Sequence, residues 1–130
     1  LIERSIPVYM TNLAHVLNDL TNFQSVDRNQ YIADLMKYPL LILDDLGIER
    51  RTDFAQEQIF NVIDERDRCG KPLIITTNIP LTLIKNPSTL YEKRVYSRID
   101  KMCTPVSFGD KGRRQAIAAA KMQQAAELLK

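Results

Sequence analysis

Two segments of the chain are apolar at nearly every position, and they set the expected fold. Residues 40–43 read LLIL, and residues 72–78 read PLIITTN, which is apolar through Ile75 and rich in β-branched side chains. Neither segment alternates between apolar and polar positions, so we expect buried strands of a parallel sheet. Shorter strands are predicted over residues 6–10, with Pro7 at a sheet edge, and over residues 103–108.

Between these strands, apolar residues recur at the spacing of amphipathic helices. The first predicted helix follows Thr11, a suitable N-cap, and a short second helix at residues 31–36 follows a polar loop. A longer helix is expected to begin at Asp53, with Gln56 as its capping partner, and to end at Gly70. Further helices are predicted at residues 81–84, at residues 88–101 and, rich in alanine, near the C-terminus.

Strands that alternate with helices predict an α/β fold, in which an open parallel sheet is flanked by helices on both faces. The composition agrees with one globular domain, because 45% of the 130 residues are hydrophobic and 26% are charged. The net charge of +2 is too small to indicate a nucleic-acid partner. No apolar run is long enough to cross a membrane. Cys69 and Cys103 lack the spacing of metal ligands, so we expect two reduced thiols.

Two adjacent aspartates, Asp44 and Asp45, follow the first apolar segment, and Asn78 ends the second. Active sites of open parallel sheets lie beyond the carboxyl ends of the strands, so these three side chains are expected at one site. Adjacent carboxylates there need a cation, and Mg²⁺ on a nucleotide phosphate accepts one or two of them. The pattern favours a site for magnesium and an attacking water. In the alternative reading, Asp44 caps a loop, Asp45 is solvated, and residues 76–78 form a strand end with an Asx turn.

A first pair of arginines lies in the segment YEKRVYSRID. Arg94 and Arg98 are four residues apart, and therefore on one face of the helix predicted there. Such a face can present guanidinium groups to the phosphates of a neighbouring subunit. It can equally form surface ion pairs, here with Glu92 or Asp100.

A second pair, Arg113 and Arg114, is predicted at the start of the last helix. Helix N-termini disfavour cations, so a nearby phosphate would explain arginines at this place. A solvated basic patch is the alternative, because five basic residues and one acid follow from Lys111 onward.

In their order and spacing, four segments resemble one known family. LLILDDLGIER, KPLIITTN, EKRVYSRI and CTPVSFGDKGRRQ look like the ATPase domain of the DnaC/IstB-type helicase loaders of the AAA+ superfamily, in the form found in replication proteins of phages and Gram-positive bacteria. The resemblance covers essentially the whole chain and implies a P-loop NTPase-type sheet that is incomplete at its N-terminus. Residues 1–130 would form one core fragment, without a separate second domain. It would run from the end of the P-loop helix, in LIER, through Walker B, sensor 1 and the arginine finger to sensor 2.

The resemblance implies a role for each residue at the strand ends. Asp44 would be the Walker B aspartate, which holds Mg²⁺ through water. Asp45 would take the place of the catalytic acid beside that metal. This acid is usually Glu in the wider superfamily, and the shorter side chain of Asp45 implies slow hydrolysis. Asn78 would be the sensor 1 residue, which contacts a water or a phosphate oxygen.

The resemblance also implies roles for the arginines. Arg98 in YSRI fits the arginine finger that reaches the phosphates of a neighbouring subunit, ahead of Arg94. Arg113 or Arg114 would be the sensor 2 arginine, which acts on the γ-phosphate of its own subunit.

For the full-length protein, the resemblance implies ATP and Mg²⁺ as cofactors and a replicative helicase as partner. It further implies homo-oligomers of the AAA+ type, contact with single-stranded DNA and a cytoplasmic location. One family element is absent from the chain, because no GxxxxGK[ST] loop occurs and no glycine precedes Gly47. That loop cradles the phosphates. We therefore expect this chain alone to bind ATP weakly or not at all, and to be inactive as an ATPase.

Two other functions belong to different classes. A non-catalytic AAA+-like module would dock on a helicase without using ATP. A phospho-receiver domain of a signalling system also carries aspartates at strand ends, but this sequence lacks the acidic cluster that follows a first strand in such domains.

Overall fold

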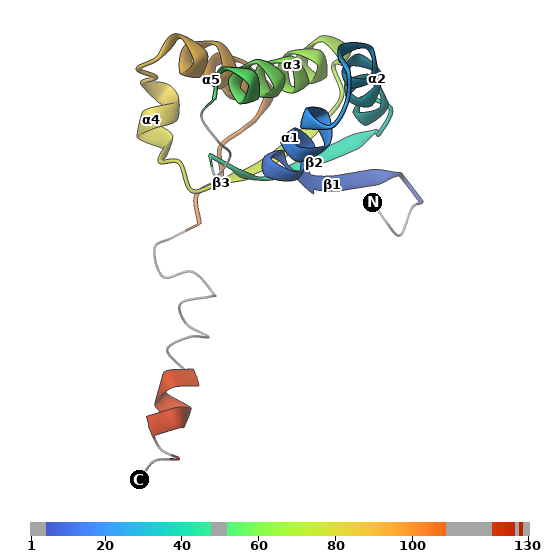
Figure 1. The fold of residues 1–130 in the computed structure, drawn as a ribbon. Coiled ribbons are helices and arrows are strands. Elements are labelled where there is room, and N and C mark those ends of the chain that lie inside the picture. The colour runs from blue at the N-terminus through green and yellow to red at the C-terminus, as the bar shows by residue number, and fades with distance from the viewer. Residues whose placement is uncertain (1–4, 48–51, 109–120, 127, 129–130) are drawn as a thin grey trace.

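A three-stranded parallel sheet forms the base of the structure (Figure 1). The structure is a computed structural model and describes residues 5–47, 52–108, 121–126 and 128. The strands are β1 (Val8–Asn12), β2 (Leu40–Leu46) and β3 (Leu73–Thr77), and they lie side by side in that order. Both neighbouring pairs are parallel. The predicted α/β class and the parallel sheet are therefore confirmed.

Five helices cover one face of this sheet. They are α1 (Leu13–Thr21), α2 (Ser25–Leu35), α3 (Asp53–Cys69), α4 (Leu81–Lys85) and α5 (Leu90–Met102), and Figure 1 shows all of them on the same side. Leu41 and Leu43 of β2 pack against them in a single core. On the other face, Met10 is 61% exposed and Ile74 is 47% exposed.

We predict helices on both faces of the sheet, but α1 to α5 all lie on one. The physical reason is the strand order, which follows the order of the chain. Crossover connections between parallel strands are right-handed. When successive crossovers move across the sheet in one direction, they place every connecting helix on the same face. Residues 121–126, in the alanine-rich segment near the C-terminus, are helical as predicted, and all six are exposed.

Two helices begin one residue away from their predicted N-caps. Asn12, not Thr11, caps α1, and its Oδ1 accepts the N–H three residues later at 2.7 Å. Thr52, not Asp53, caps α3, and its Oγ1 accepts the Ala55 N–H at 3.1 Å. Asp53 instead lies in the first turn, where a negative charge also stabilises a helix.

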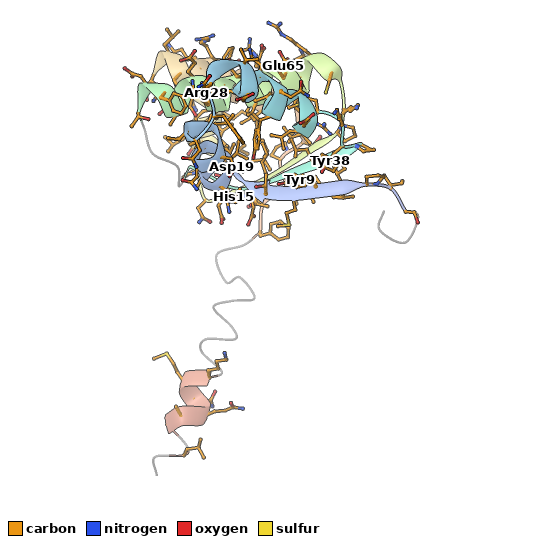
Figure 2. The ribbon with its side chains drawn as sticks, turned by 45° about the vertical axis from the view of Figure 1, so that its right-hand side comes forward. Tyr9, His15, Asp19, Arg28, Tyr38 and Glu65 are labelled. Atoms are coloured by element: carbon orange, nitrogen blue, oxygen red, sulfur yellow. The ribbon has the colours of Figure 1, made fainter. Side chains whose placement is uncertain are left out.

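Helix α2 begins at Ser25, so much of the predicted polar loop is helical. Its buried side chains, Ile32 and Leu35, lie only in its second half. Arg28, which is labelled in Figure 2, fixes the first half, because its Nε donates to the Leu20 carbonyl at 3.0 Å. An apolar stripe that is confined to one end gives no periodic signal over the whole helix.

The strand predicted over residues 103–108 is wrong. These residues are described, but they contain no strand. A strand forms only when its backbone pairs with a neighbour, and in the described residues the outer edge of β3 has no partner strand. The segment starts beside β3, where the Cys103 thiol lies 3.7 Å from the Leu73 carbonyl. Beyond that point Val106 and Phe108 are exposed.

The described residues show neither a disulfide nor a membrane span. Cys69 and Cys103 are both free, as predicted, although Cys69 is exposed and only Cys103 is half-buried. Burial raises the pKa of the Cys103 thiol, which keeps it protonated at neutral pH. Within this part of the chain, no helix combines the length and the apolar character that a bilayer crossing requires.

One arginine lies inside the core, although its sequence pattern gave no indication of this. Arg66 on α3 is 0% exposed. Its guanidinium donates to the Tyr38 carbonyl at 3.0 Å, to the Pro39 carbonyl at 3.3 Å and to the Pro72 carbonyl at 2.5 and 3.1 Å. Pro39 and Pro72 immediately precede β2 and β3, so Arg66 fixes the starts of both strands against α3. Burial lowers its pKa, but an arginine stays protonated at neutral pH.

Candidate functional site

The two aspartates lie in a β-bulge at the carboxyl end of β2. Leu43 pairs with Ile75, but the next pair joins Leu46 to Thr77, so β2 contains one residue more than β3 over this interval. The bulge places Asp45 at φ 59°, in the left-handed region. That conformation costs a non-glycine residue about 1–2 kcal/mol, and it occurs mostly at sites where surrounding contacts hold it.

Thr76 of β3 holds both aspartates. Its Oγ1 donates a short hydrogen bond to Asp44 Oδ1 and accepts the Asp45 N–H at 3.0 Å. The next residue fixes the backbone beyond the bulge, because Thr77 Oγ1 donates to the Leu46 carbonyl at 2.6 Å and accepts the Ile79 N–H at 3.0 Å. The sequence pattern does not predict these two separate links to β2, because they join residues that are 31 positions apart.

The carboxylates of Asp44 and Asp45 have no ion-pair partner in the described residues. Asp44 is half-buried and Asp45 is exposed. Across the described ranges, no cluster of three or more metal-ligating side chains is present. Two carboxylates with an open approach fit a hard cation such as Mg²⁺, which keeps several waters and takes its remaining oxygens from a substrate phosphate.

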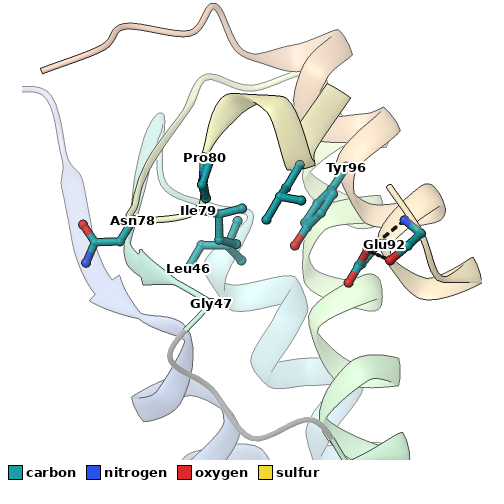
Figure 3. Close-up of a pocket in the computed structure, with 9 residues that line it drawn as sticks. Leu46, Gly47, Asn78, Ile79, Pro80, Glu92 and Tyr96 are labelled. Carbon is teal, nitrogen blue, oxygen red and sulfur yellow. Dashed lines mark hydrogen bonds between the residues drawn. The ribbon is translucent and has the colours of Figure 1, made fainter. Parts of the chain in front are cut away.

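Asn78 follows β3 directly, at the same edge of the sheet as the aspartates. Its side chain is exposed. Figure 3 shows the amide directed away from Tyr96 and Glu92. The structure thus places Asp44, Asp45 and Asn78 together at the carboxyl ends of neighbouring strands, as predicted. Thr76 is the additional residue that joins the two aspartates.

A hollow of about 460 Å³ lies beyond the strand ends, beneath α4 and α5, and Asn78 is one of its lining residues (Figure 3). Its lining is mostly apolar, with Leu46, Ile79 and Leu83 among its residues. Among the described residues that line it, the carboxylate is Glu92, which forms the capping box of α5 with Thr89. Its Oε2 accepts from the Thr89 N–H at 3.5 Å and from the Ser88 N–H at 3.0 Å, so this carboxylate is engaged in holding the start of α5.

Gly47 closes the strand end at a point where the structure requires glycine. It has φ 106°, and a Cβ at this position would lie 2.9 Å from Ile79 Cδ1. Gly47→Ala is expected to lower the free energy of unfolding by about 2–3 kcal/mol, which combines backbone strain with the cost of overpacking. Urea unfolding measures the change.

Gly70→Ala is the matched control for Gly47. Gly70 ends α3 at φ 68°, as predicted, but a Cβ there would meet nothing within 4 Å. It should cost only the left-handed backbone penalty of about 1 kcal/mol. Equal losses in the two variants would show that contact with Ile79 contributes nothing.

The arginines of α5 stack on a single aromatic ring of α3. The guanidinium carbons of Arg94 and Arg98 lie 3.8 and 4.7 Å from the centre of the Phe60 ring. Arg98 Nε also donates to Asp64 Oδ1 at 2.9 Å, and Arg98 is 28% exposed. Arg94 is exposed and has no carboxylate partner in the described part of the chain. Neither arginine contacts Asp44 or Asp45.

The surface ion pairs suggested for these arginines, with Glu92 or Asp100, are not the ones formed. Glu92 caps α5, and Asp100 pairs with Lys85 of α4. Arg98 pairs instead with Asp64, which is distant in sequence and could not be identified from helical spacing.

The remaining candidates, Arg113 and Arg114, lie outside the described residues, as does LIER at residues 1–4.

The family described as IstB-like ATP binding protein matches residues 2–94, a range that includes both aspartates, Asn78 and Arg94. No curated protein matches the chain. Among solved structures, the chain is similar to one described as the crystal structure of the DnaC helicase loader, with a TM-score of 0.62 and 22% sequence identity.

That structural match covers 79% of this chain and 62% of the loader chain. The chain therefore spans less than two thirds of the length of the solved loader. The likeness confirms the predicted fold class, an α/β fold of the P-loop NTPase type. The family match covers well over half of the chain, and it argues against the alternative that the chain is a phospho-receiver domain. The chain belongs to the family of IstB-like ATP binding proteins.

Proposed function

We propose that this chain supplies the magnesium and water side of an ATP site in a replicative helicase loader. The observation that carries the proposal is the pair of aspartates in the bulge of β2, whose carboxylates have no cation partner in the described residues. Thr76 holds the pair through the Asp44 carboxylate and the Asp45 N–H. Membership of an ATP-binding family supports ATP as the ligand. The likeness to a DnaC loader supports a fold in which such carboxylates face a nucleotide.

The three residues at the strand ends have different roles in the proposed ATP site. Asp44 binds Mg²⁺ through water, with the carboxylate oxygen that Thr76 leaves free. Asp45 accepts a hydrogen bond from the attacking water and orients it toward the γ-phosphate. Asn78 contacts that water or a phosphate oxygen through its amide. When bound, Mg²⁺ neutralises the charge that develops on the β- and γ-phosphates.

The arginines complete the site in an oligomer. Arg98 acts as the arginine finger on the nucleotide of a neighbouring copy, and Arg94 is the second choice. Arg113 or Arg114 acts as sensor 2 on the nucleotide of its own copy. In this proposal, residues 1–130 are the core from the end of the P-loop helix to sensor 2. They contain no separate second domain and no phosphate loop, so this chain alone binds ATP weakly or not at all.

The proposed partner is a replicative helicase, and the proposed form of the loader is that of replication proteins of phages and Gram-positive bacteria. The protein works in the cytoplasm as an AAA+-type homo-oligomer and contacts single-stranded DNA during loading. Slow hydrolysis suits a switch of this kind, because the lifetime of the ATP state then sets how long the loader holds its helicase.

Helicase binding in the presence of ATP and of ADP tests the proposal. A loader binds the helicase differently with the two nucleotides, and Arg98→Ala removes that difference. A non-catalytic docking module is the second candidate. It is favoured by the arginines of α5, which stack on Phe60 and, for Arg98, pair with Asp64 of their own chain. It predicts helicase binding that is the same with either nucleotide and in Arg98→Ala.

Mixing two inactive variants tests whether Arg98 acts across a subunit interface. Asp44→Asn and Arg98→Ala are each expected to lose on the order of 10²–10³ in ATP hydrolysis. A mixture should regain activity, because some interfaces then join an intact Asp44 site to an intact Arg98. Steady-state phosphate release measures the recovery.

Arg68→Ala is the matched control for that experiment. Arg68 shares Asp64 with Arg98 through a 3.0 Å contact, but its side chain is 71% exposed. Its loss should leave hydrolysis within about twofold, as expected for a surface ion pair worth less than 1 kcal/mol. If Arg94→Ala loses hydrolysis and Arg98→Ala does not, the finger role passes to Arg94.

A further inference from the structure

We propose that Thr76 is a positioning residue, which sets the geometry of both aspartates for cation and water. This inference rests on the proposed function of Asp44 and Asp45. It concerns a side chain that lies on β3, one strand away from the carboxylates on β2.

The hydroxyl of Thr76 acts as both a hydrogen-bond donor and a hydrogen-bond acceptor. A threonine hydroxyl has one hydrogen to donate and two lone pairs to accept with. Here it donates to Asp44 Oδ1 and accepts the Asp45 N–H at 3.0 Å. The donated bond orients the Asp44 carboxylate and occupies one oxygen, which leaves Oδ2 for a cation or its water.

The accepted bond holds the backbone of Asp45. At φ 59° this residue has a conformation that L side chains avoid. The bulge also takes Asp45 out of the regular pairing of β2 with β3, and its N–H is accepted by the Thr76 hydroxyl instead. Without that bond the bulge can relax toward regular pairing, and a shift of one residue in register turns a side chain to the opposite face of a sheet. The carboxylate of Asp45 would then leave the site.

Packing does not explain the choice of threonine at this position. Thr76 is exposed, as is Ile74 two residues earlier on the same face of β3, whereas the half-buried Thr77 faces the helices. Valine has nearly the same shape and is also favoured in strands. Thr76→Val thus removes the hydroxyl and its two hydrogen bonds while it keeps the shape of the side chain.

The test compares Thr76→Val and Thr76→Ser with the natural protein, used at its full length. Amide hydrogen exchange by NMR, without nucleotide, reports the Asp45 N–H directly. We expect Thr76→Val to speed this exchange at least tenfold. Thr76→Ser, which keeps the hydroxyl, should stay within about threefold. Thr77→Val is the matched control, since its hydroxyl contacts Leu46 and Ile79 and should leave the Asp45 amide unchanged.

Hydrolysis of Mg-ATP provides the second readout. Thr76→Val should lower kcat at least tenfold with KM within threefold, and Thr76→Ser should restore kcat. A Thr76→Val variant with natural exchange and natural kcat would overturn the positioning role. So would a Thr76→Ser variant as defective as Thr76→Val. If the natural protein does not hydrolyse ATP, the proposed function fails. The exchange of the Asp45 amide still decides whether Thr76 holds the bulge.

Discussion

Arg66→Ala is expected to lower the free energy of unfolding by about 3–5 kcal/mol, the largest stability loss of any single substitution considered for this chain. The side chain is 0% exposed and donates to three backbone carbonyls. Its removal takes the guanidinium donor from the Tyr38 and Pro39 carbonyls and leaves the Pro72 carbonyl with the Leu41 N–H at 3.4 Å. Each hydrogen bond lost to a charged group costs about 1.5–3 kcal/mol, which water and relaxation partly recover. The substitution also opens a cavity between α3 and the starts of β2 and β3.

A loss of that size is a large part of the 5–15 kcal/mol that typically stabilises a domain. Arg66→Lys should recover little, because a single ammonium cannot reach carbonyls from two different loops as a planar guanidinium does. Urea unfolding followed by circular dichroism measures both variants.

Arg68→Ala is the control for Arg66→Ala, since it removes another arginine side chain two residues further along α3. Its partner is Asp64, and its side chain is 71% exposed. The expected loss is below about 1 kcal/mol. If Arg66→Ala and Arg68→Ala unfold at similar urea concentrations, the carbonyl contacts of Arg66 do not stabilise the sheet.

Asp44→Asn is expected to abolish Mg²⁺-dependent ATP hydrolysis in the natural protein, by a factor on the order of 10² or more, and to leave its fold intact. Loss of the negative charge removes the attraction for the cation and its waters. The amide can still accept the Thr76 hydroxyl through its own Oδ1, so the bulge keeps that hydrogen bond.

Phosphate release at several Mg²⁺ concentrations measures the effect of Asp44→Asn, and thermal unfolding checks the fold. Asp34→Asn is a suitable control, because Asp34 is an exposed carboxylate of α2 whose partner is Lys37. It should hydrolyse ATP at the natural rate. If Asp44→Asn hydrolyses ATP at the natural rate, the Asp44 carboxylate does not hold the metal.

The sequence was sufficient for the sheet and for the strand ends of the site. Segments 40–43 and 72–78 are apolar and β-branched, which is a local property that survives folding. Once both are parallel strands, Asp44 and Asn78 must lie at the same edge. That inference needed no knowledge of side-chain contacts, and the structure agrees with it.

The features that the sequence did not predict depend on contacts between distant residues. In the sequence, Arg66 looks like one more charged residue on the exposed face of a helix. In the structure it is buried, and its guanidinium donates to the carbonyls of Tyr38, Pro39 and Pro72. Arg98 pairs with Asp64, 34 residues away. The strand predicted over residues 103–108 failed for the same reason, since local propensity cannot supply a neighbour for pairing.

The most direct test of the account is a calorimetric titration of Mg-ATP into two polypeptides. One is residues 1–130, and the other is the same chain extended upstream by the sequence that its own gene encodes. We expect binding by the extended polypeptide, loss of that binding in Asp44→Asn, and weak or no binding by residues 1–130. Submicromolar binding by residues 1–130, or no binding by either polypeptide, would contradict this expectation.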